Sequence, residues 1–164
     1  MTESTMPSGR SAPMAVTLAR VAAVLGLLHA AFSVYWALGG TWLLDTIGGS
    51  LEAGGRAGDP LIRTLVWTAV AMKLIAVVAG LLAVSPDLRG RPRRVARFVA
   101  WSAAVILTLY GGVLTGAGLL VQTGVIPAAP DADHRALAWH TFLWDPWFLL
   151  WGLVLGLALW YSRD

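Results

Sequence analysis

The sequence predicts an all-α integral membrane protein, a bundle of four transmembrane helices with both termini in the cytoplasm. This prediction rests on the low charge content, on four long apolar stretches, and on the distribution of arginine between them. Charged residues make up 13% of the chain and hydrophobic residues 57%. A soluble domain usually has about 25% charged residues. Lipid must therefore cover much of the surface of this protein.

Four apolar stretches are long enough to cross a bilayer, whose core requires about 20 helical residues. The expected spans are residues 14–38, 61–84, 95–122 and 138–161. They form one domain, residues 14–161, which follows a disordered cytoplasmic segment, residues 1–13, and precedes a cytoplasmic tail, residues 162–164. A cleaved signal peptide is the alternative for the first span, but its apolar run is long for one.

Arginine is concentrated in alternate connecting segments. Eight arginines lie in the N-terminal segment, around the connection between the second and third spans, or in the tail: Arg10, Arg20, Arg89, Arg91, Arg93, Arg94, Arg97 and Arg163. The other two connections hold only Arg56, Arg63 and Arg135. Because positively charged loops stay in the cytoplasm, we expect a multi-pass protein of a bacterial inner (plasma) membrane, with the lipid bilayer as its first partner.

Several classes of partner and chemistry are disfavoured. The net charge of +3 and the pI near 10 might have suggested nucleic acid, but the basic residues lie in short segments between apolar spans, so no nucleic acid is expected. The absence of cysteine excludes disulfides, thiolate nucleophiles and cysteine metal sites. There is no glycine-rich phosphate loop, and neither a cofactor nor a metal is expected.

Small and polar residues recur at helical spacing, which allows membrane helices to approach closely. On the first and third spans we expect these stripes to face the interior: Ala22, Gly26, His29, Ser33 and Gly40, and Thr108, Gly111, Thr115, Gly118 and Gln122. The small-xxx-small pairs are Gly112 with Gly116 and Gly152 with Gly156. They predict ordinary helix packing, and such glycine-rich faces would also allow a homo-oligomer.

Two ionisable residues lie inside expected spans, where they are costly and therefore functional candidates. His29 lies about two-thirds of the way across the first span, and the alternative for it is a neutral ring bonded to a neighbouring helix. Lys73 lies near the middle of the second span, where a charged lysine costs about 2.5–3.5 kcal/mol. It could be neutral, paired with a carboxylate, or extended toward a surface. Tyr110, at a similar depth on the third span, is its nearest expected neighbour.

The fourth span opens with the most distinctive segment, WHTFLWDPWFLLWG, residues 139–152. His140, Trp144 and Trp147 fall on one helical face, with Asp145 on a neighbouring face. Asp145 followed by Pro146 is also typical of a helix start, with aspartate as the N-cap. A helix that began at Pro146 would be too short for a full crossing. We therefore expect helix on both sides of Asp145, with a kink or break there.

Tryptophan occurs nine times and is concentrated toward the expected outer side. An aromatic belt at the membrane interface explains most of these residues, but not the excess on one side. The excess predicts an aromatic-lined cavity, in which Tyr35, Trp36, Trp144 and Trp147 would contact a substrate.

The segment HAAFSVYWALGGTW, residues 29–42, together with residues 139–152, resembles a bacterial family of four-helix membrane proteins common in actinobacteria and known as a domain of unknown function. The resemblance covers about residues 20–161 and implies the topology and a membrane location, without an activity. A looser similarity, of architecture alone, is to four-helix sterol isomerase-type proteins, which use acid–base residues and a tryptophan inside a membrane cavity.

The first functional hypothesis is a membrane isomerase or cyclase that acts on a lipophilic, isoprenoid-type small molecule. Asp145 would be the general acid, and His29 or His140 would orient it or take the proton back. The aromatic walls would stabilise cationic intermediates, with Lys73 and Tyr110 also binding substrate.

Three alternatives remain open from the sequence. A transporter would use Lys73, His29 and Asp145 as a polar path. An accessory membrane subunit would use the glycine faces and the tryptophans to bind a partner. A bis-histidine haem protein would use His29 and His140 as ligands.

Overall fold

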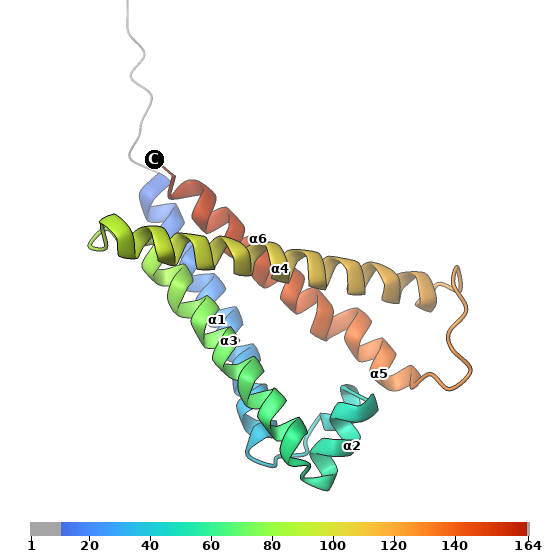
Figure 1. The fold of residues 1–164 in the computed structure, drawn as a ribbon. Helices are drawn as coiled ribbons and strands as arrows, with labels where there is room; N and C mark the ends of the chain where they lie inside the picture. The colour runs from blue at the N-terminus through green and yellow to red at the C-terminus, as the bar shows by residue number, and fades with distance from the viewer. Residues whose placement is uncertain (1–10, 164) are drawn as a thin grey trace, which may run out of the picture.

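The computed structural model describes residues 11–163, and every regular element in that range is helical. The long helices are α1 (Ser11–Ala37), α3 (Pro60–Val84), α4 (Gly90–Gln122) and a composite fourth span, which consists of α5 (His134–Trp139), a π-helical turn (His140–Trp144) and α6 (Asp145–Tyr161). These four segments are long and apolar enough to cross a membrane. The predicted fold class, an all-α bundle of four potential membrane spans, is therefore confirmed (Figure 1).

Two short elements lie between α1 and α3. For the glycine-rich connection of residues 39–60 the sequence predicts a long loop with a short interfacial helix near residues 42–47. The structure has a 3₁₀ turn there, Leu44–Thr46, and a further helix, α2 (Gly49–Ala57), that the loop prediction did not include. Three of the nine residues of α2 are glycine, which disfavours helix. Of the segment 1–13 that was predicted to be disordered, residues 1–10 lie outside the described part, and residues 11–13 belong to α1.

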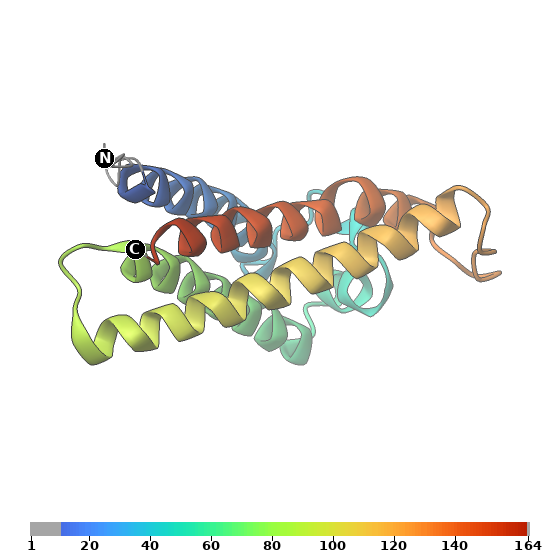
Figure 2. The ribbon, with the colours of Figure 1, turned by 90° about the horizontal axis from the view of Figure 1, so that it is seen from above.

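The four long helices pack as a ring in which α6 contacts α1 and α4, and α3 contacts α1 and α4. The start of α1, the end of α6 and the connection between α3 and α4 lie at one end of the bundle, which we call the turn end (Figures 1 and 2). From there α3 and α4 separate toward the opposite end, the α2 end (Figure 1). The large core residues are Trp151, Leu155 and Leu159, which pack against alanines of the other three helices. This core leaves most of the large apolar side chains exposed.

Glycines of α4 and α6 allow these two helices to approach closely. A Cβ atom at Gly111 would meet the backbone of Leu149 and Asp145, and one at Gly152 would meet the backbone of α4. The expected interior stripe of α1 is also observed, since Ala22, Gly26, His29 and Ser33 are buried. On α4, Gly111 and Gly118 are buried and Thr108 and Thr115 are half-buried, whereas Gln122 is exposed. The interior stripes are therefore confirmed except at their ends, since Gly40 lies beyond the end of α1 and is only half-buried.

The predicted packing role of two other glycines is wrong. A Cβ atom at Gly116 or at Gly156 would meet no atom of the described residues within 4 Å. Residues five apart on an α-helix point about 140° away from one another, so the contact at Gly111 turns Gly116 away from α6. Small-xxx-small spacing alone does not identify which glycine face is buried.

Substituting Gly111 with valine is expected to destabilise the bundle by about 1–3 kcal/mol, because the added atoms overlap backbone that cannot rotate away. Thermal unfolding of the purified protein in mild detergent measures this effect. Gly116→Val is the matched control, with an expected change below about 0.5 kcal/mol. Equal losses in the two variants would contradict the close approach of α4 and α6.

Candidate functional site

A cavity of about 360 Å³ lies in the half of the bundle nearer the α2 end. Its walls come from the last turns of α1, the first half of α3, the middle of α4, the π-helical turn and the start of α6. A covering segment, residues 43–59, also lines it. The wall residues that carry chemistry or aromatic rings are His29, Ser33, Trp36, Lys73, Tyr110, His140, Trp144 and Phe148. Its volume falls within the range of about 300–1,000 Å³ that is usual for small-molecule sites.

His29 is buried in the wall of this cavity, with 4% of its surface exposed. Neither ring nitrogen has a hydrogen-bond partner among the described residues. Its ring centroid lies 4.3 Å from that of Phe148, 5.5 Å from that of Trp147 and 5.8 Å from that of Trp144. Buried polar groups almost always have a partner, so the two ring nitrogens of His29 are an exception in the wall of this cavity.

Lys73 of α3 lines the cavity and is hydrogen-bonded to α1. Its Nζ donates a hydrogen bond to Ser33 Oγ at 2.6 Å and lies 5.8 Å from the centroid of the Phe148 ring. Within residues 11–163 no carboxylate forms an ion pair with Lys73. Ser33 follows His29 by one helical turn, so His29, Ser33 and Lys73 form a polar strip inside an otherwise apolar wall.

His140 and Asp145 form a buried pair at the start of the fourth span. Asp145 is 4% exposed, and its Oδ1 lies 3.3 Å from His140 Nδ1. His140 Nε2 lies 3.3 Å from the carbonyl oxygen of Ile47, in the covering segment. Both partner atoms are acceptors, so a protonated ring would donate to both of them. His140 lines the cavity, whereas Asp145 lies behind it.

The π-helical turn makes this pair geometrically feasible. His140 and Asp145 are five residues apart, and in an α-helix such residues point about 140° away from each other. In the π turn the N–H of Asp145 donates to the carbonyl of His140, five residues back, which brings the two side chains to one side. The helix continues on both sides of Asp145, as expected, and the predicted break is this π turn. π turns of this kind often occur at functional sites.

The alternative role of Asp145 as an N-cap is wrong. The residue has helical dihedral angles, φ −77° and ψ −41°, and the chain is already helical before it. Its side chain contacts His140 rather than a backbone N–H of the next turn. Pro146 lacks an N–H and is tolerated here because the preceding π turn already interrupts the regular hydrogen-bond ladder.

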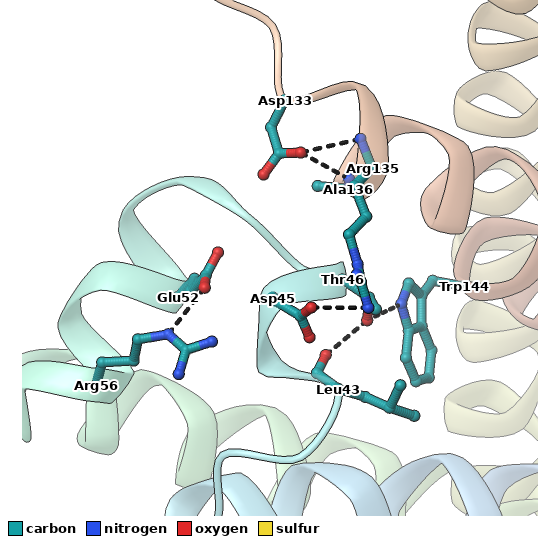
Figure 3. A network of polar contacts seen from close by, with 9 residues as sticks. All are labelled: Leu43, Asp45, Thr46, Glu52, Arg56, Asp133, Arg135, Ala136 and Trp144. Carbon is teal, nitrogen blue, oxygen red and sulfur yellow. Dashed lines mark hydrogen bonds and ion pairs between the residues drawn. The ribbon is translucent and has the colours of Figure 1, made fainter.

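The covering segment is fastened to the fourth span by side-chain contacts (Figure 3). Trp144 Nε1 donates to Thr46 Oγ1 at 3.1 Å, and that hydroxyl donates to the carbonyl of Leu43 at 2.6 Å. Arg135 Nη2 forms an ion pair with Asp45 Oδ2 at 2.8 Å. Together with the contact between His140 and Ile47, these bonds hold the covering segment over the cavity.

The remaining predicted site residues divide into two groups. Trp36 and Tyr110 line the cavity, and Tyr110 also meets the ring of Phe148 edge-on at 5.5 Å between centroids. Tyr35 and Trp147 lie elsewhere. The hydroxyl of Tyr35 accepts the backbone N–H of Trp42 at 3.3 Å, and Trp147 Nε1 donates to the carbonyl of Leu25 at 3.1 Å. These two side chains support the walls from outside.

Some residues around the cavity were not predicted from the sequence. Ser33 belonged to the polar stripe of the first span, and its position one turn after His29 was a usable signal. Phe148 lay within the aromatic segment but was not singled out. Thr46 and Ile47 had no signal, because their role depends on a tertiary contact between the covering segment and the fourth span.

Comparison with known proteins identifies the family of this chain but does not indicate an activity. Residues 26–155 match the family described as "Protein of unknown function (DUF3995)". No curated protein and no solved structure matches the chain. The matched range contains all the residues that carry chemistry in the cavity, from His29 to Phe148.

Proposed function

The chain belongs to the DUF3995 family, whose function is unknown, and from its cavity we propose that it is a membrane enzyme that moves a proton on a lipophilic molecule. The reaction is an isomerisation or cyclisation, and the substrate is of isoprenoid type. One observation carries the proposal. Two histidines face an aromatic-lined cavity inside a helical bundle, one with free ring nitrogens and the other backed by a buried carboxylate.

Access from the lipid supports a lipophilic substrate. Leu65 of α3 and Tyr110 of α4 both line the cavity, and each is also 50% exposed on the outside of the bundle. The cavity therefore reaches the surface between α3 and α4, where the two helices diverge (Figure 1). A molecule dissolved in the bilayer would enter there without crossing water.

The arrangement assigns different roles to the two histidines. His140 donates a proton from Nε2 to a carbon of the substrate, which requires Nε2 to leave the Ile47 carbonyl oxygen, 3.3 Å away. Asp145 orients the His140 ring and balances its charge. His29 accepts a proton from another carbon, so the number of protons on the substrate is unchanged in an isomerisation. The faces of Trp36, Trp144 and Phe148 stabilise the intervening carbocation. Asp145 thus acts through His140 rather than as the acid itself.

The arginine distribution favours a cavity in the outer half of the bacterial plasma membrane. Four arginines, Arg89, Arg91, Arg93 and Arg94, gather at the turn end, opposite the cavity. Positively charged connections face the cytoplasm. The start of α1 and the end of α6 lie at that same turn end (Figure 1).

The haem alternative receives less support from the geometry. An axial histidine needs a free ring nitrogen, and both nitrogens of His140 already face acceptors.

Deuterium transfer from solvent tests the proposal directly. The protein in lipid nanodiscs is incubated in D₂O with a panel of isoprenoid lipids, and mass spectrometry measures deuterium in the recovered lipid. Wild type is expected to label at least one lipid, and Asp145→Asn or His140→Gln is expected to slow labelling about 100-fold or more. His134→Gln alters an exposed histidine outside the cavity and should label at the wild-type rate. A panel left unlabelled by wild type would refute the proposal.

A further inference from the structure

We infer that the cavity binds a ligand with a terminal carboxylate on a long apolar body, and that Lys73 binds that carboxylate. The inference rests on the proposed function only in taking the cavity as the ligand site. It does not depend on the proton-transfer chemistry.

The choice of residue at position 73 is unusual for this chain. The chain has twelve basic residues, of which eleven are arginine and one is lysine. That single lysine lies in the middle of a membrane-spanning helix and lines the cavity. A cation in such a position is costly unless a partner compensates it. Among residues 11–163 no carboxylate does so, and an anion in the cavity would.

The neighbours of Lys73 complete a site for a carboxylate. Ser33 Oγ accepts from Nζ at 2.6 Å and fixes the amine at the cavity wall. His29, one turn away on α1, is 4% exposed and has both ring nitrogens without a partner in the described chain. The amine and the imidazole N–H are two donors, which match the two oxygens of a carboxylate.

The charges of the whole lining also favour an anion. Asp59 is the one carboxylate among the described lining residues, and its Oδ1 already accepts the N–H of Leu61 at 2.7 Å at the start of α3. Arg63, one turn along α3, adds a second basic side chain to the lining. The other wall residues are mostly apolar or aromatic, which suits a hydrocarbon body. A phosphate would need more donors than this wall offers, since phosphate sites usually use an arginine fork or several N–H groups.

Native mass spectrometry of the full chain in mild detergent tests this inference with four probes of equal chain length: palmitate, methyl palmitate, hexadecanol and hexadecyl phosphate. Palmitate is expected to bind at least 10-fold more tightly than the ester and the alcohol. Lys73→Met should reduce palmitate binding at least 10-fold, to the level of the ester. Arg91→Met removes a cation at the turn end, and palmitate binding should stay at the wild-type level.

A second measurement does not require a variant. Lys73 carries the one ε-amino group of the chain, so its reductive methylation can be followed by peptide mass spectrometry. Palmitate should slow methylation of Lys73 at least 10-fold, and methyl palmitate should not.

Several outcomes would overturn the inference. Equal binding of palmitate and its ester, or undiminished binding of palmitate to Lys73→Met, would contradict it. Tighter binding of hexadecyl phosphate than of palmitate would contradict the carboxylate and indicate that the site binds a phosphate. Palmitate binding without any deuterium transfer would instead refute the proposed enzyme and leave the carboxylate site in place. Deuterium transfer to neutral isoprenoids, with no preference for palmitate, would do the reverse.

Discussion

Replacing Trp144 with alanine is expected to lower the free energy of unfolding by about 3–5 kcal/mol, the usual cost of truncating a buried tryptophan. Trp144 is 2% exposed, and its ring centroid lies within 6 Å of those of His29, Phe32 and Trp36. Its Nε1 also donates to Thr46 and so fastens the covering segment. The substitution therefore leaves a void beside the cavity and removes one of the bonds that close it.

Unfolding by SDS in mixed micelles, followed by circular dichroism, measures this loss. Phe142→Ala is the matched control, because Phe142 is an aromatic residue of the same π turn but is 64% exposed. Its expected loss is below about 1 kcal/mol. Thr46→Val should cost about 1–3 kcal/mol, because it leaves the indole N–H buried without an acceptor. A Trp144→Ala variant as stable as Phe142→Ala would contradict the packing described for this ring.

The second large effect is expected at the pair of His140 and Asp145. Replacing His140 with phenylalanine leaves the buried carboxylate of Asp145 without its hydrogen-bond partner. Breaking a buried pair from one side costs about 3–5 kcal/mol. When Asp145 is also replaced, by leucine, no carboxylate remains to be compensated. The double variant should therefore be more stable than His140→Phe alone.

The same unfolding assay, applied to both single variants and the double variant, gives the coupling between the two side chains. We expect a coupling of about 0.5–3 kcal/mol, as is usual for residues in direct contact. His134→Phe, which changes an exposed histidine at the start of α5, should have almost no effect. If the two losses simply add, the contact between His140 and Asp145 has no energetic role.

The fold could be predicted from the sequence because the bilayer constrains it strongly. Four runs of apolar residues are long enough to cross a bilayer, and segments that span a membrane must satisfy their backbone internally as helices. The same constraint identified His29 and Lys73, since polar groups inside spans are costly. The structure places both in the wall of the cavity.

Other parts of the site depended on contacts that local sequence does not encode. Tyr35 and Trp147 have the same composition and depth as the lining aromatics, and only the rotation of their helices turns them away from the cavity. The two signals around Asp145, a cap and a break, were equally consistent with the sequence. In the structure the helix continues through a π turn, and Thr141 of that turn packs against Gly118 of α4. Helix α2 was not predicted, because three of its nine residues are glycine, which disfavours helix.

The π turn has a consequence for comparing members of the family. A π turn contains one residue more than an α-helix needs to cover the same rise. A relative whose fourth span is a plain α-helix would therefore align with a single-residue gap between positions 140 and 144, within a span that otherwise tolerates no gaps. In such a relative the residues that correspond to His140 and Asp145 would be four apart, and residues four apart on an α-helix lie on the same face. The pair could then form without a π turn, so a gap at this point would by itself not mean that the pair is lost.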